Sequence, residues 1–126
     1  MILSIDPGLS GGIAQLDATV IIIALHDMPT RTLKKKKEID AAALANLMRD
    51  ADVIYIEQVG SRPGQDVVSA FSFGRNLAYI LGAAGALKKQ DNMVRPQDWQ
   101  AMFGLATGEK DKARKKQQIA DKALEF

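Results

Sequence analysis

The sequence lacks cysteine and has little histidine, proline or tryptophan. Its 126 residues include no cysteine, one histidine, four prolines and one tryptophan. Without cysteine, disulfide bonds and thiolate metal sites are excluded, and nothing indicates an oxidising compartment. The apolar runs stop well short of the roughly 20 residues that span a bilayer, so no membrane segment is expected. We therefore expect a cytoplasmic protein.

The composition is that of an ordinary globular protein with unevenly placed charge. Hydrophobic residues make up 47% of the chain and charged residues 25%. This length predicts a single domain over residues 1–126. The net charge is only +2, but lysines cluster at 34–37 and basic residues again at 110–116. Such clusters fit an anionic partner, most often nucleic acid, and a solvated lysine face fits the same pattern.

The pattern of apolar residues changes about a third of the way along the chain. Short β-branched runs over residues 2–6, 13–16 and 20–25 predict an antiparallel meander. Helices and strands then alternate, with Asp40 and Asp66 as N-caps. The expected elements are helix 41–48, strand 53–57, helix 67–87, strand 93–94, helix 96–103 with Gly104 as its stop, and a helix from about 109 to Phe126. The order predicts an α/β fold with a mixed five-stranded sheet flanked by helices.

Several single residues carry further expectations. His26, after the third strand, is expected to be a surface or edge residue rather than a ligand. Phe71 is expected to be buried, and Trp99 and Phe103 to pack in the core from one face of a short helix. Small residues in the long helix indicate close approach of another backbone, across a sheet or a subunit. They are Gly74, Gly82 and Gly85.

Two carboxylates stand where apolar strands end. Asp6 follows the first strand, and Glu57 ends the strand that follows the first helix. A crossover helix would bring these two strands side by side and parallel, with both acids at one sheet edge. Two nearby carboxylates repel, and a hard cation such as Mg²⁺ would relieve that repulsion. Metal-assisted phosphoryl transfer is the natural chemistry of such a pair, whereas each acid alone fits a simple strand-end cap.

The chain resembles a known family in several segments, in order along its whole length. The opening segment is Ile5-Asp6-Pro7-Gly8, and the second acid lies in Ile56-Glu57-Gln58-Val59. Further matching segments are Ser72-Phe73-Gly74-Arg75, Val94-Arg95-Pro96 and Asp111-Lys112. Together these segments resemble the RuvC-type Holliday-junction resolvases, and most of all their phage and prophage relatives.

The resemblance implies an RNase H-like fold, a homodimer, and Mg²⁺-dependent nicking of branched DNA, with Mn²⁺ as a substitute ion. By motif match, Asp6 and Glu57 would be catalytic residues and the first two metal ligands. Lys112 matches a basic position that faces DNA in the family, and Arg62 lies in the loop after Glu57. The candidate DNA-binding residues are Lys110, Lys112, Arg62 and Arg75.

The sequence departs from the family at its C-terminal end. RuvC-type enzymes complete the site with acidic or histidine residues on a further C-terminal helix, and this sequence stops before it. Asp111 and Asp121 are poor substitutes, because one opens a helix among lysines and the other lies away from the apolar stripe. The resulting hypothesis is a chain that folds and binds DNA but is catalytically impaired.

Two other readings stay open. The chain could be a non-catalytic DNA-binding or dimerisation protein on a nuclease fold. An Ile-Asp-Pro-Gly strand also resembles the phosphate loop of actin-like and sugar-kinase ATPases. Those ATPases need two such domains and a second aspartate-glycine loop, neither of which the sequence contains, so no nucleotide cofactor is expected.

Overall fold

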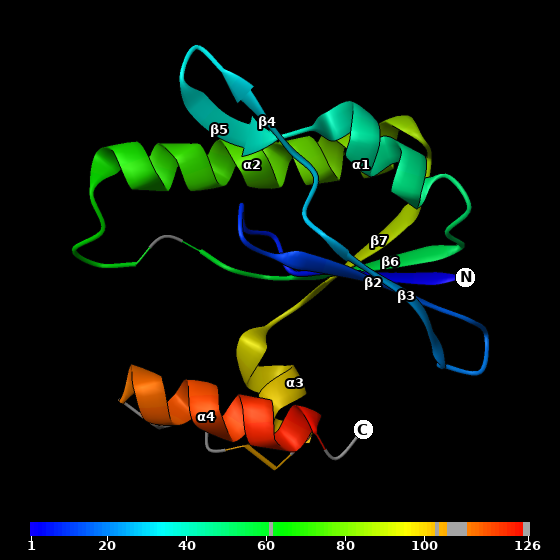
Figure 1. Cartoon of the computed structure of the whole chain (residues 1–126), viewed down its shortest axis with the longest axis vertical. Helices are drawn as coiled ribbons and strands as arrows, with labels where there is room; N and C mark the ends of the chain where they lie inside the picture. Colours follow the sequence, from blue (N-terminus) through cyan, green and yellow to red (C-terminus); the bar gives the residue numbers. More distant parts are fainter. Residues whose placement is uncertain (61, 103, 106–110, 125–126) are drawn as a thin grey trace. The chain divides into compact units, whose positions relative to one another are not determined.

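The computed structural model describes residues 1–60, 62–102, 104–105 and 111–124. The chain forms two compact units, Met1–Met93 and Val94–Phe126. In the first unit, two helices cover one face of a β-sheet (Figure 1). The second unit carries two further helices. The expectation of one domain over residues 1–126 stays a prediction.

The sheet has five strands in the order β3-β2-β1-β6-β7. The strands are β1 (Ile2–Ile5), β2 (Gly12–Leu16), β3 (Ile22–Asp27), β6 (Val53–Glu57) and β7 (Gln90–Val94). Strands β1, β2 and β3 form an antiparallel meander, and β6 pairs parallel with β1. The predicted α/β fold with a mixed five-stranded sheet is therefore confirmed.

The third strand begins and ends two residues later than predicted. The turn before it uses the first apolar residues, because the Val20 N–H donates to the Asp17 carbonyl and the Asp17 carboxylate accepts from the Ile21 N–H. Val20 itself has a positive φ of 65°. Apolar character therefore marked the strand correctly, while hydrogen bonding in the turn moved its start.

The core lies between the sheet and two helices, α1 (Ala41–Met48) and α2 (Val67–Ala86). Alternate strand residues point into it, as the period-2 geometry of a strand requires. The predicted N-caps are confirmed: the Asp40 carboxylate accepts from the Ala43 N–H, and the Asp66 carboxylate from the Ser69 N–H. The fully buried residues include Leu3, Ile54 and Ile56 of the sheet, Leu44 and Met48 of α1, and Ile80 and Ala84 of α2.

A β-hairpin that the sequence analysis missed precedes α1. Its strands are β4 (Thr30–Leu33) and β5 (Lys36–Ile39), which form a separate two-stranded sheet. The lysine run at 34–37 gave no strand signal, because consecutive lysines have low strand propensity and show no alternation of apolar and polar residues. Lys34 and Lys35 occupy the turn with φ of 48° and 63°.

Buried polar contacts hold this hairpin against α2. The Glu38 side chain, 3% exposed, accepts from Arg31 Nε at 2.9 Å and from the Tyr79 hydroxyl at 3.0 Å. The Ile39 N–H donates to Asn76 Oδ1 at 3.0 Å, and Asn76 is buried in α2. The buried side chains of Glu38 and Asn76 therefore both have hydrogen-bond partners in this contact.

The outer face of α2 differs from expectation. A Cβ atom added at Gly74, Gly82 or Gly85 would meet nothing within 4 Å, so no other backbone in the described chain approaches these glycines. Phe71 is 71% exposed rather than buried, because it lies on the side of α2 away from the core. The expected close approach within the chain is therefore wrong, and an approach by a second subunit stays open.

By length and composition, α2 could also cross a membrane, with a mean hydropathy of 1.2 over 18 residues. No membrane segment was expected from the lengths of the apolar runs in the sequence. The helix carries buried Ile80 and Ala84 toward the sheet and packs against α1 and β5. Only 17% of that 18-residue window is buried inside the protein.

The second unit contains α3 (Pro96–Met102) and α4 (Lys112–Ala123). Gly104, with a φ of 69°, follows α3, and its N–H donates to the Ala101 carbonyl, in agreement with the predicted helix stop. The predicted helix from about 109 begins at Lys112, because the Asp111 carboxylate caps it. Trp99 is half-buried, and Phe103 and the sequence end at 125–126 lie outside the described residues.

The hydrogen bond from Ile39 to Asn76 predicts a stability effect. Asn76→Ala should lower the free energy of unfolding by about 1–3 kcal/mol, because it leaves the buried Ile39 N–H without its acceptor. Urea unfolding followed by circular dichroism measures this change. Asn46→Ala, the same substitution at an exposed position of α1, should cost less than about 0.5 kcal/mol. Equal losses in the two variants would contradict the anchoring role of Asn76.

Candidate active site

Asp6 is held immediately after β1 by a tight turn. Its N–H donates to the Gly12 carbonyl at 2.9 Å, and its carbonyl accepts from the Gly8 N–H at 3.0 Å. Within this turn a Cβ at Gly11 would lie 2.1 Å from the Asp6 carbonyl oxygen, so only glycine fits there. The glycine-bearing turn thus fixes the Asp6 backbone, and the Asp6 side chain is exposed.

Glu57 ends the neighbouring strand in the matching register. Ile5 of β1 pairs with Ile56 of β6, so Asp6 and Glu57 are the next residues along two parallel strands. Neighbouring strands lie about 4.8 Å apart. Ile5 and Ile56 point into the core, and by alternation Asp6 and Glu57 point to the other face of the sheet. We call this the carboxylate face, and it also carries Ser4 and Tyr55.

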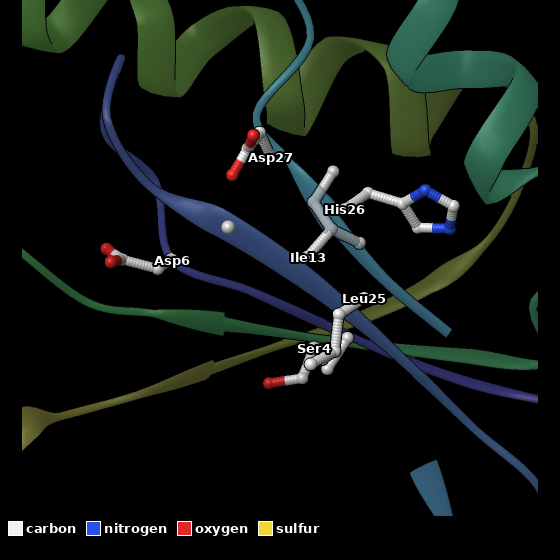
Figure 2. A pocket seen from close by; sticks show the side chains of 8 residues that line it. Ser4, Asp6, Ile13, Leu25, His26 and Asp27 are labelled. Carbon is white, nitrogen blue, oxygen red and sulfur yellow. The ribbon is translucent and has the colours of Figure 1, made fainter. Parts of the chain in front are cut away.

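A third carboxylate, Asp27, lies near Asp6 at the same end of the sheet. Asp27 ends β3 and pairs with Gly12, whose lack of a side chain leaves the space beside Asp6 open. Asp6, Gly12 and Asp27 line one pocket, together with Ser4 and Leu25. Figure 2 shows the two aspartates at one end of the strands. Asp27 was not predicted as a site residue, because the third strand was expected to end at Leu25. A signal was nevertheless present in the sequence, since Asp27 is an acid that follows an apolar run.

His26 lies within β3 rather than after it. It pairs with Ile13, which points into the core, so both lie on the helix-covered face. Its ring is turned away from Asp6 and Asp27 (Figure 2). The His26 Nε2 atom is buried and has no hydrogen-bond partner in the described part of the chain. The placement after the strand was therefore wrong, because β3 extends to Asp27.

The predicted basic residues are dispersed. Arg62 is exposed in the loop after β6, where its N–H donates to the Gln65 side chain. Arg75 on α2 lies 3.9 Å from Glu38 of the hairpin, and its Nε is buried without a partner among the described residues. Lys112 is exposed as the first residue of α4 in the second unit. Lys110 lies outside the described residues.

Several acids outside the pair serve local roles. Asp111 caps α4, and the Asp121 carboxylate accepts from the Gln117 side chain on the same helix. The Ser69 hydroxyl and N–H donate to Asp66 and lower the pKa of that carboxyl below its ordinary value. A hydrogen bond from Arg95 likewise lowers the pKa of Asp98. These groups are accounted for by caps and ion pairs.

The donor set at the sheet end suits a hard cation that needs few protein ligands. In residues 1–60, 62–102, 104–105 and 111–124, no group of three or more histidine, cysteine or acidic side chains is gathered closely enough to hold a metal ion. Asp27 therefore does not complete a three-ligand set with Asp6 and Glu57. Mg²⁺ commonly uses one or two carboxylates and completes its shell with water and phosphate oxygens. Two carboxylates on adjacent strands meet that minimum.

Comparison with known proteins identifies the fold. No protein-family model matches the chain, and no curated protein matches it either. Among solved structures, it is similar to T. thermophilus RuvC in complex with a Holliday junction substrate, with a TM-score of 0.60, 13% sequence identity, and coverage of 82% of this chain and 70% of that chain. It is also similar to Thermus thermophilus RuvC, with a TM-score of 0.55, 19% identity, and coverage of 86% and 72%.

At these identities the likeness concerns the fold. The match covers 82% of this chain, whose five-stranded sheet has the order β3-β2-β1-β6-β7. The chain therefore has an RNase H-like fold, as these RuvC structures do.

Proposed function

We propose that the protein is a structure-selective DNA endonuclease that resolves branched DNA, including Holliday junctions, by Mg²⁺-dependent phosphodiester hydrolysis. The observation that carries the proposal is the placement of Asp6 and Glu57 at the ends of two adjacent parallel strands, on the same sheet face. The fold of a RuvC that was solved with a Holliday junction substrate supports this choice of reaction.

Asp6 and Glu57 would hold the metal ion, with Mn²⁺ able to replace Mg²⁺. Such an ion activates water and stabilises the charge that develops on the leaving oxygen. The protein's own contribution is positional. The Gly11 turn fixes Asp6, and the β1–β6 register fixes Glu57 beside it. A divalent cation would be attracted by two carboxylates held this close together.

The DNA would be bound through basic side chains that contact phosphates rather than bases. Lys112 and Arg62 are exposed and suit this role. We keep Lys110 as a further candidate and place Arg75 last, because its guanidinium lies beside Glu38. A cytoplasmic location fits a protein that acts on cellular DNA.

A homodimer is the expected assembly, and the outer face of α2 is its candidate interface. Five exposed residues recur along this face at intervals of three or four positions: Phe71, Gly74, Ala78, Gly82 and Gly85. Small residues along one stripe allow two helices to approach closely. Two copies would also suit the two strands that must be cut symmetrically in a four-way junction.

A non-catalytic DNA-binding protein on the same fold is the second candidate. It is favoured by one observation: the described residues supply two neighbouring carboxylates and no cluster of three metal ligands. This alternative predicts junction binding that depends strongly on salt and does not respond to divalent metal.

Loss of the first carboxylate should weaken metal binding and suppress nicking. Asp6→Asn should lower Mn²⁺ affinity by at least about tenfold in calorimetry and Mg²⁺-dependent nicking of a four-way junction by at least about a hundredfold, because a charged ligand is lost. Junction binding should stay equal or tighten, since less negative charge faces the phosphates.

Asp50→Asn, at an exposed turn, is the matched control and should bind Mn²⁺ and nick DNA as the wild type does. Mn²⁺ affinity that is unchanged by Asp6→Asn would refute the metal role. A wild-type chain that binds junctions but never responds to Mg²⁺ or Mn²⁺ would favour the non-catalytic alternative.

A charge placed on the outer face of α2 should separate the dimer. Ala78→Glu would bury an unpaired carboxylate between two helices and should raise the dimer dissociation constant by about a hundredfold or more. Sedimentation equilibrium distinguishes the 13.7 kDa monomer from the dimer. Ala42→Glu, the same change at an exposed position of α1, should leave the dimer intact. Dissociation by both variants, or a monomeric wild type, would reject α2 as the interface.

A further inference from the structure

The tip of the β4–β5 hairpin concentrates positive charge on a small exposed surface. Lys34, Lys35, Lys36 and Lys37 are consecutive and all exposed, and no acidic residue lies among residues 33–37. We call these four residues the lysine tip. Figure 1 shows the tip standing clear of α2 on the side away from the five-stranded sheet. Four like charges this close repel one another in water, so an anionic partner would stabilise them.

The turn residues at the tip are unusual for their backbone conformation. Leu33 pairs with Lys36, which leaves Lys34 and Lys35 as a two-residue turn with φ of 48° and 63°. Two positive φ values in succession are typical of a type I′ turn, which strongly favours Asn-Gly. A positive φ at these two positions is energetically unfavourable for lysine but not for glycine. Lysines serving only solubility could stand anywhere on the surface, so their use here indicates a role for charge at this point.

Hydrogen bonds hold the hairpin that carries the tip against α2. Glu38, directly after the tip, accepts hydrogen bonds from Arg31 on the partner strand and from Tyr79 on α2. Asn76 on α2 accepts from the backbone of Ile39. The only carboxylate of the hairpin is thus engaged at its base and does not neutralise the tip. A tip on a hairpin that is already held in place loses little conformational freedom when it binds a partner, which favours affinity.

We propose that the lysine tip is a contact surface for the phosphate backbone of DNA, which rests on the proposed function and extends it to a second part of the substrate. The hairpin that carries the tip packs against α2 through β5, on the opposite side of the sheet from Asp6 and Glu57. It therefore contacts a duplex segment away from the bond that is cut, such as another arm of the junction. Lysine ammonium groups act as point charges toward phosphates, so this contact is independent of base sequence.

The test replaces the turn lysines by the residues that the turn prefers. Lys34→Asn with Lys35→Gly removes two charges while keeping the type I′ turn, so circular dichroism and urea unfolding should show an unchanged or more stable fold. Binding to a four-way junction and to a linear duplex is measured without divalent cations over a range of salt concentrations. The slope of log K against log salt, which is negative, should become shallower by about 1.8 for two lost phosphate contacts, and affinity at 0.1 M salt should fall by roughly sixtyfold.

Lys88→Asn is the matched control, because Lys88 is also an exposed lysine with a positive φ, 56°, but lies after α2. It should leave the slope unchanged. An unchanged slope in the double variant, or an equal loss per charge at Lys88, would overturn the proposal. Loss of binding to phosphatidylserine vesicles with an unchanged DNA slope would also overturn it and assign the tip to a membrane surface. Because no cleavage is measured, failure here is distinct from absence of nuclease activity.

Discussion

The parallel pairing of β1 with β6 is the constraint on which the rest of the structure depends. It requires the chain to leave the meander, cross over through α1 and return beside its first strand. The pairing of Ile5 with Ile56 directs two apolar side chains into the core and aligns the next two residues on the opposite face. A shift of one residue would turn Glu57 into the core, where an unpaired carboxylate is costly. The register of β1 and β6 therefore determines both the packing of the core and the placement of Asp6 beside Glu57.

Backbone geometry, rather than side-chain hydrogen bonds, defines the end of the sheet where Asp6 lies. The turn after β1 is closed by contacts among Asp6, Gly8, Gly11 and Gly12, and no side chain could be added at Gly11 without a severe clash. Gly12 then separates Asp6 from Asp27 without filling the space between them. The result is an acidic sheet edge at which Asp6 and Asp27 are both exposed.

On the side of the sheet that the helices cover, the polar side chains of interest are buried and hydrogen-bonded rather than exposed. Glu38 and Asn76 are buried there, yet each has hydrogen-bond partners that join the β4–β5 hairpin to α2. These contacts hold a strongly basic turn away from the acidic sheet edge. Asp6 and the four lysines at 34–37 are all exposed. The long helix α2 links these regions and leaves its own outer face uncovered within the described chain.

Local patterns in the sequence determined the mixed sheet, the caps at Asp40 and Asp66, and the two strand-end acids, because strand alternation and N-cap chemistry are short-range effects. The β4–β5 hairpin escaped detection, since its stability comes from Glu38 and Asn76 contacts that join residues about 40 positions apart. Tertiary structure likewise decided that Asp27 lies near Asp6, that Phe71 is exposed, and that Arg75 lies beside Glu38. Each of these depends on which strand or helix lies next to which. The neighbours of each strand and helix are determined by burial of the whole core. They therefore cannot be predicted from the residue spacing within a single segment.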